Sequence, residues 1–91
     1  MTKSELIALI KQELADRYEK PLDTISDDTD LIDDLGVDSL DMTEILVSIE
    51  DKLGIRIVDD LVDRPSTPVK LAEFLESYLA SVGYQDGPSN T

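Results

Sequence analysis

Ser39 lies where a short turn gives way to a stretch with helical periodicity. The sequence across this junction, residues 35–40, reads Leu-Gly-Val-Asp-Ser-Leu. Gly36 favours a backbone with positive φ, and Asp38 and Ser39 are both preferred N-cap residues of an α-helix. The N–H groups and the dipole at the start of a helix also stabilise a phosphate ester. We therefore interpret Ser39 as a site that another protein modifies, with a purely structural N-cap as the alternative.

The side chains that most enzymes use for acid–base chemistry are missing from this chain. It contains no histidine and no cysteine. The commonest general base, the commonest metal ligand and any thiol or disulfide chemistry are thereby removed. Without a histidine to accept its proton, Ser39 is not expected to act as a nucleophile of its own enzyme. We predict that the chain is not an enzyme, with no catalytic residue and no dedicated metal site.

The negative charge of the chain is large and unevenly placed. The formal net charge is −13 at pH 7 over 91 residues, and no lysine or arginine occurs between residues 21 and 51. That stretch holds eleven acids: Asp23, Asp27, Asp28, Asp30, Asp33, Asp34, Asp38, Asp41, Glu44, Glu50 and Asp51. Such a charge disfavours nucleic acid and anionic membranes as partners. A solubilising surface is the simplest interpretation, but the position of Ser39 inside the run favours a docking surface for basic partners.

The acids before Gly36 suggest a calcium-binding loop, but their spacing is wrong for one. Counting from Asp28, the fifth position is Ile32 and the sixth is Asp33. An EF-hand needs an oxygen ligand and then a glycine at these positions. The spacing therefore argues against a calcium sensor, although clustered carboxylates associate weakly with divalent ions.

The first helix is predicted at residues 3–18, because Thr2 and Glu5 match the capping-box pattern. Apolar residues then follow on one helix face: Leu6, Ile7, Ile10, Leu14 and Tyr18. Residues 22–34 have no sustained period and are predicted to form a long ordered loop. We expect four apolar side chains to anchor this loop to the core: Ile25, Leu31, Ile32 and Leu35.

The second helix is predicted at residues 39–53, with Gly54 as its C-terminal stop. At about 100° per residue, one arc of this helix forms a buried stripe. Its members are Met42, Ile45, Leu46, Ile49 and Leu53. Leu40 and Val47 fall on the opposite face, among acids. We interpret this outward face as a recognition patch for a partner.

The last helix is predicted to start in the Pro-Ser-Thr-Pro segment at residues 65–68, with Thr67 as N-cap and Pro68 at the first helical position. Its predicted core face consists of Leu71, Ala72, Leu75, Tyr78, Leu79 and Val82. A short helical turn is predicted at residues 59–62. Residues 84–91, which follow Gly83, are predicted to form a flexible C-terminal tail.

Three main helices, one short helix and a long first loop predict an all-α fold, a small four-helix bundle. The length of 91 residues suits one domain, which we assign to residues 1–83. No stretch approaches the roughly 20 apolar residues of a membrane span, and the N-terminus lacks a signal pattern. We expect a cytoplasmic monomer that contacts neither membranes nor nucleic acid.

The residues around Ser39 resemble the attachment motif of acyl carrier proteins, which has a Gly-x-Asp-Ser-Leu core. Residues 35–41 read Leu-Gly-Val-Asp-Ser-Leu-Asp. The resemblance covers residues 3–82, including the acidic loop and the Glu-Ile-Leu and Glu-Asp-Lys-Leu-Gly-Ile runs of the second helix. An isolated Asp-Ser-Leu triplet is a weak signal. Here the triplet lies in a domain of the expected size, charge and helix pattern.

This resemblance implies that Ser39 receives a 4′-phosphopantetheine arm from coenzyme A, added by a separate magnesium-dependent phosphopantetheinyl transferase. Acyl groups then travel as thioesters on the terminal thiol of the arm, and Asp38 helps to position the metal during the transfer. The other implied partners are a ketosynthase, an acyltransferase and further pathway enzymes with basic docking patches. The positions that match the family's partner-binding residues are Leu40, Asp41, Glu44, Val47, Glu50 and Asp51.

Some residues depart from the commonest fatty-acid pattern. Thr43 lies where fatty-acid carriers commonly have an aliphatic residue, and the 65–68 segment and the last helix with Tyr78 also differ. The Asp before Ser39, in place of a Gly-Gly-His-Ser type of motif, argues against a typical peptidyl carrier. We therefore expect a free-standing carrier for a polyketide or other specialised pathway, with primary fatty-acid synthesis as the alternative. An alternative of another class is an acidic regulatory domain that a kinase phosphorylates at Ser39.

Overall fold

Three α-helices form the framework of the computed structural model, which describes residues 2–57 and 65–83. They span Lys3–Tyr18 (α1), Ser39–Leu53 (α2) and Pro68–Ser81 (α3), and a single 3-10 turn, η1, spans Leu22–Thr24. No strand occurs in the two described ranges, so this part of the chain has the all-α fold that the sequence predicts. The short helix predicted at residues 59–62 and the tail predicted at residues 84–91 lie outside the described residues.

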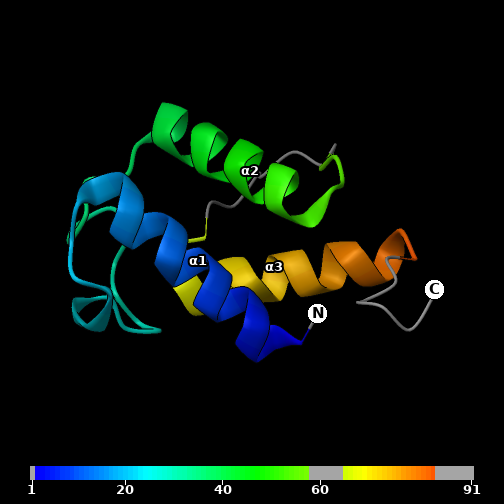
Figure 1. Ribbon diagram of the computed structural model, residues 1–91, viewed down its shortest axis with the longest axis horizontal. Helices are drawn as coiled ribbons and strands as arrows, with labels where there is room; N and C mark the ends of the chain where they lie inside the picture. Colours follow the sequence, from blue (N-terminus) through cyan, green and yellow to red (C-terminus); the bar gives the residue numbers. More distant parts are fainter. Residues whose placement is uncertain (1, 58–64, 84–91) are drawn as a thin grey trace.

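α1 packs against both other helices, with α2 above it and α3 beside it in Figure 1. Its start is fixed by the predicted capping box. The Thr2 hydroxyl accepts the Glu5 N–H at 3.1 Å, and the Glu5 carboxylate accepts the Thr2 N–H at 2.8 Å. Two N–H groups that the helix itself cannot pair are thereby satisfied. At the other end, Glu19 has a left-handed backbone with a φ of 53°, which turns the chain into the loop.

The core is built from one apolar face of each helix together with the loop. The largest side chains with no exposed surface include Leu6, Ile10, Leu14, Leu31, Ile45, Ile49, Leu71 and Leu75. On α2 the predicted stripe is confirmed, because Met42 and Leu53 are also buried and Leu46 is half-buried. Burial of one such side chain stabilises the fold by about 1.5–3 kcal/mol. This face therefore holds α2 in the bundle.

The loop between α1 and α2 is tied to the start of α3 by two backbone hydrogen bonds. The Leu31 N–H donates to the Ser66 carbonyl oxygen at 2.9 Å, and the Val69 N–H donates to the Asp27 carbonyl oxygen at 3.1 Å. Ile25 and Leu31 are buried, as predicted. These contacts order the loop although its sequence has no period.

The prediction that Ile32 anchors the loop is wrong, because this residue is 54% exposed. The Asp30 carboxylate accepts the N–H groups of Ile32 and Asp33 at 2.9 and 2.7 Å. This tight turn leaves Leu31 in the core and Ile32 outside it. Val37, which the sequence pattern did not mark, is buried in the core as well.

α3 begins as the sequence predicts. The Thr67 hydroxyl accepts the Lys70 N–H at 3.2 Å, and Pro68 occupies the start of the helix, where a missing N–H costs no intrahelical bond. The predicted place of Val82 in the core face is wrong. The helix ends at Ser81, so Val82 leaves the helical register and is 53% exposed.

Candidate functional site

The loop enters α2 through a glycine turn. Gly36 has a φ of 71°, in the left-handed region that glycine adopts without steric cost, and its N–H donates to the Ile32 carbonyl oxygen at 2.9 Å. The side chain of Val37 is buried, and its N–H donates to the Leu31 carbonyl oxygen at 2.9 Å. The backbone that leads to Asp38 is thus anchored, which fixes where α2 begins.

Asp38, and not Ser39, is the N-cap of α2. The Asp38 carboxylate accepts the Asp41 N–H at 2.8 Å, and the Asp41 carboxylate accepts the Asp38 N–H at 3.2 Å. This second capping box stabilises the helix start and gives Asp41 a structural role. Ser39 is therefore the first helical residue, and its side chain is not required for the cap.

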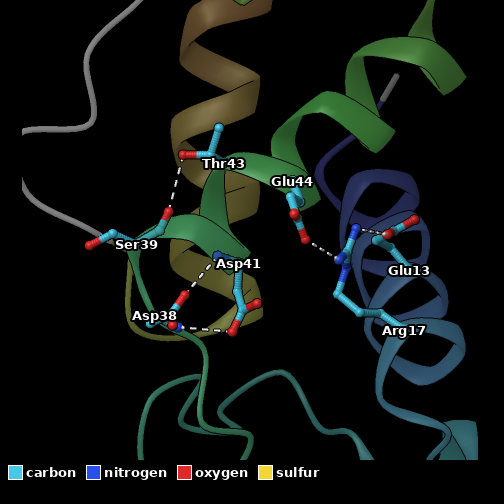
Figure 2. Close-up of polar contacts among 7 residues, drawn as sticks. All are labelled: Glu13, Arg17, Asp38, Ser39, Asp41, Thr43 and Glu44. Carbon is cyan, nitrogen blue, oxygen red and sulfur yellow. Dashed lines mark hydrogen bonds and ion pairs between the residues drawn. The ribbon is translucent and has the colours of Figure 1, made fainter.

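Ser39 is exposed, and its hydroxyl points away from the acids around it (Figure 2). Its carbonyl oxygen accepts a hydrogen bond from the Thr43 hydroxyl at 3.1 Å. Within the part of the chain that the structure describes, the Ser39 hydroxyl itself makes no hydrogen bond. It is thus accessible at the positive end of the helix dipole, where N–H groups stabilise a phosphate.

Three of the predicted partner-binding residues are exposed on one side of α2. Leu40 is 66% exposed and Val47 is 49% exposed. Asp51, one helical turn beyond Val47, is also exposed and takes part in no ion pair among the described residues. These side chains lie on the outward face of α2, and Leu40 follows Ser39 directly in the sequence.

Two other predicted partner-binding residues already have partners inside the chain. Glu44 on α2 pairs with Arg17 on α1, with Oε1 and Nη1 3.0 Å apart (Figure 2). The Glu50 carboxylate accepts the N–H of Ile57, in the segment after α2. Both carboxylates are therefore partly used by the fold itself.

A buried carboxylate that the sequence did not mark as functional lies between α1 and α2. Glu13 is 7% exposed, and its carboxylate pairs with Lys52 Nζ at 3.2 Å and with Arg17 Nη2 at 3.4 Å. These cations offset the cost of burying the charge. The sequence contained one indication that Glu13 is buried. It lies three residues after Ile10 and seven after Leu6, which places an acid on the apolar face of α1.

Two acids of the loop, Asp30 and Asp34, bind backbone N–H groups, and Asp27 pairs with Lys11 on α1. The Asp34 carboxylate accepts the Asp30 N–H at 2.9 Å, and the Asp30 carboxylate accepts the N–H groups of the next turn. Among residues 2–57 and 65–83, no group of three or more acids could hold a metal ion.

Tyr18, at the end of α1, interacts with the acids at the start of α2. Burial raises the pKa of the Tyr18 hydroxyl above its ordinary value of 10.0, the Asp41 carboxylate raises this pKa further, and the Arg17 guanidinium lowers it. The hydroxyl therefore stays neutral to higher pH in the folded chain than in the unfolded chain. Its contribution to the free energy of unfolding is complete below about pH 10 and is lost as pH rises through the raised pKa.

We expect the absorbance titration of tyrosinate in the folded protein to contain a late component that Tyr18→Phe lacks. The free energy of unfolding of the wild type should also fall more steeply above about pH 10 than that of Tyr18→Phe. Chemical denaturation at a series of pH values measures this difference. Parallel stability curves for the two proteins would contradict the assignment.

Comparison with known proteins decides the family. A family model described as the phosphopantetheine attachment site matches residues 8–75, a range that contains all of α2. An acyl carrier protein of Lactobacillus acidophilus is 31% identical over 86% of this chain and 98% of that protein. An acyl carrier protein of Saccharopolyspora erythraea is 32% identical over 97% and 96%, and acyl carrier protein 3 of Ralstonia nicotianae is 33% identical over 93% and 98%. The chain belongs to the acyl carrier protein family.

The resemblance that the Gly-x-Asp-Ser-Leu core indicates is therefore confirmed. As an acyl carrier protein, the chain carries a covalent 4′-phosphopantetheine group and is a carrier, not an enzyme. Such a carrier meets a phosphopantetheinyl transferase, which attaches the group, and the enzymes of its pathway. No helix in the described ranges has the length and apolar character needed to span a bilayer.

Proposed function

We propose that Ser39 is the attachment site of the phosphopantetheine arm, on which acyl groups travel as thioesters. The observation that carries this proposal is the exposed Ser39 hydroxyl at the first helical position, which the cap does not use. The N-terminus of α2 suits the phosphodiester, because its N–H groups and dipole favour negative charge there. In the transfer, Ser39 Oγ bonds to the β-phosphorus of coenzyme A, adenosine 3′,5′-bisphosphate leaves, and a base of the transferase takes the hydroxyl proton.

Asp38 is the residue of this chain that we propose for metal positioning during the transfer. Its Oδ1 atom accepts the Asp41 N–H. Among the described residues, no donor engages its Oδ2 atom. That oxygen is available to the magnesium ion of the transferase, which prefers oxygen ligands and binds few protein carboxylates. The cap and the metal-positioning role are thus compatible.

Incubation with coenzyme A, magnesium and a broad-specificity phosphopantetheinyl transferase tests the attachment. Intact-mass spectrometry should show the gain of one phosphopantetheine group, and peptide mapping should place it on Ser39. A wild-type chain that remains unmodified, or is modified elsewhere, would reject the proposal. A chain that gains only phosphate, from ATP and a kinase, would favour the regulatory-domain alternative.

We propose that the outward face of α2 docks the transferase, a ketosynthase, an acyltransferase and further enzymes through their basic patches. The proposed docking residues are Leu40, Asp41, Glu44, Val47, Glu50 and Asp51. Exposed ion pairs contribute only about 0.2–1 kcal/mol each, so docking should be transient and sensitive to salt. A carrier that must leave each enzyme needs such weak contacts. Because coenzyme A supplies the arm, we place this exchange in the cytoplasm.

For the pathway we propose polyketide or other specialised synthesis, with primary fatty-acid synthesis as the alternative. Support comes from Thr43, which is exposed on α2 with its hydroxyl bonded to the Ser39 carbonyl oxygen, where fatty-acid carriers commonly present an aliphatic side chain. Mass analysis of the cargo on the carrier isolated from its native cells separates the two pathways. Saturated, even-numbered acyl chains alone would favour fatty-acid synthesis.

A further inference from the structure

Arg17 brings a positive charge from α1 to the acidic face of α2. Its Nη1 atom lies 3.0 Å from Oε1 of Glu44, and its Nη2 atom lies 3.4 Å from Oε2 of Glu13 (Figure 2). The guanidinium thus bridges a buried carboxylate on its own helix and an exposed carboxylate on the docking helix. The ion pair joins residues 27 positions apart, so only the packing of α1 on α2 creates it.

The buried carboxylate keeps this guanidinium in place. The Glu13 side chain is 9% exposed and the Arg17 side chain is 24% exposed, whereas the Glu44 side chain is 52% exposed. A buried carboxylate holds its cations strongly, because leaving it unpaired is costly. Glu44 is therefore the member of this triad that can leave, and Arg17 remains beneath the docking face when it does.

Asp51 provides the contrast on the same helix. It is exposed and forms no ion pair within the described ranges, so none of the cations described there offsets its charge. Glu44 is equally placed on α2 but has its charge offset by Arg17. A basic side chain that approaches Glu44 must displace the guanidinium or share the carboxylate with it. In either case Arg17 takes part of the attraction that Glu44 would otherwise offer the partner.

From this geometry we infer that Arg17 masks Glu44 and weakens docking to basic partners, so that the carrier is released more readily. The inference rests on the proposed docking role of α2 and adds a specificity-determining residue on a different helix. Asp51 then carries more of the attraction to a basic partner than Glu44 does. Arg17 acts on the partner through Glu44, so removing both side chains must cancel the effect.

Binding of the apo chain to a broad-specificity phosphopantetheinyl transferase, measured at low and at physiological salt, tests this masking. Arg17→Gln should lower Kd by about two- to fivefold relative to the wild type, with a steeper dependence on salt. Lys3→Gln is the matched control, because Lys3 also joins α1 to a neighbouring helix, through Glu73 at 3.2 Å, and its loss changes the net charge equally. In the Arg17→Gln background, Glu44→Gln should return Kd to the wild-type range. In the wild-type background it should have a smaller effect than Asp51→Asn.

Each outcome of this double-mutant cycle decides the inference. Masking would be overturned if Arg17→Gln and Lys3→Gln gave equal Kd values. It would also be overturned if the effects of Arg17→Gln and Glu44→Gln on the binding free energy were additive. A Glu44→Gln effect as large as that of Asp51→Asn would overturn it as well. Arg17→Gln retains a Lys52 partner for Glu13, and circular dichroism checks its fold. If Arg17→Gln unfolds, the comparison of Glu44→Gln with Asp51→Asn still decides. If the transferase modifies Ser39 of the wild type but the variants show no masking, only the inference about Arg17 is rejected. If the transferase neither binds nor modifies the wild type, the proposed function is rejected as well.

Discussion

Replacing Ser39 by alanine is expected to abolish attachment of the phosphopantetheine arm and to leave the fold intact. The first part follows from chemistry, because alanine has no oxygen to bond to phosphorus. The second part follows from the helix start, where Asp38 and Asp41 form the capping box and the Ser39 side chain makes no bond within the described part of the chain. Alanine is also the best helix former at an exposed helical position.

Asp38→Ala is the informative companion of Ser39→Ala. It removes the N-cap and should lower the free energy of unfolding by about 0.5–2 kcal/mol. It should also slow the transfer without abolishing it, because the Ser39 hydroxyl remains. Intact-mass time courses and chemical denaturation of both variants measure the two effects. A Ser39→Ala chain that still gains the arm, or one that loses as much stability as Asp38→Ala, would refute the assignment of roles at this junction.

The helices and most of their boundaries could be predicted because their signals are local. Thr2 and Glu5 lie three residues apart, and so do Thr67 and Lys70, so each cap is formed within one helical turn. The buried stripe of α2 depends only on the helical period and on the contrast between apolar and polar side chains. Such features need no knowledge of the rest of the fold. The sequence could not predict which of Asp38 and Ser39 is the N-cap of α2, because both residue types are good N-caps.

The features that failed, or were missed, depend on the geometry of turns and helix ends or on contacts between distant residues. Ile32 and Leu31 are adjacent and equally apolar, and only the turn at Asp30 decides which one is buried. The pairing of Glu44 with Arg17 requires α1 and α2 to pack in one particular register. The sequence therefore did not distinguish among the four acids of α2 predicted to bind partners, although the structure gives them unequal surroundings.

This inequality changes how the acidic face should be understood. A count of carboxylates treats α2 as a uniform negative surface. In the structure, Asp41 caps the helix, Glu44 is paired with Arg17, and Glu50 binds the backbone after the helix. Of the proposed docking residues, Leu40, Val47 and Asp51 are exposed, and their side chains form no hydrogen bond or ion pair within the described ranges. If this face docks partners as proposed, docking depends on apolar contact as well as on charge.

Truncation of Ile45 should produce the largest loss of stability among the variants considered. Ile45 lies on the inward face of α2 and has no exposed surface. Ile45→Ala removes buried methyl groups and leaves a cavity in a close-packed core, which costs about 2–5 kcal/mol. A domain of this size has a free energy of unfolding of only about 5–15 kcal/mol. Chemical denaturation should therefore show a clearly lowered midpoint, and Ser39 should remain modifiable wherever the variant is folded.

Val47→Ala is the matched control, since it shortens an apolar side chain two residues away on the outward face of the same helix. Val47 is 49% exposed, so its truncation should change the free energy of unfolding by no more than about 0.5 kcal/mol. If the outward face docks partners, Val47→Ala should instead weaken transferase binding, with little change in the salt dependence because no charge is lost. Ile45→Ala should thus lower the free energy of unfolding, whereas Val47→Ala should weaken transferase binding and leave the free energy of unfolding nearly unchanged. Equal losses of stability would mean that the inward and outward faces of α2 have been assigned incorrectly.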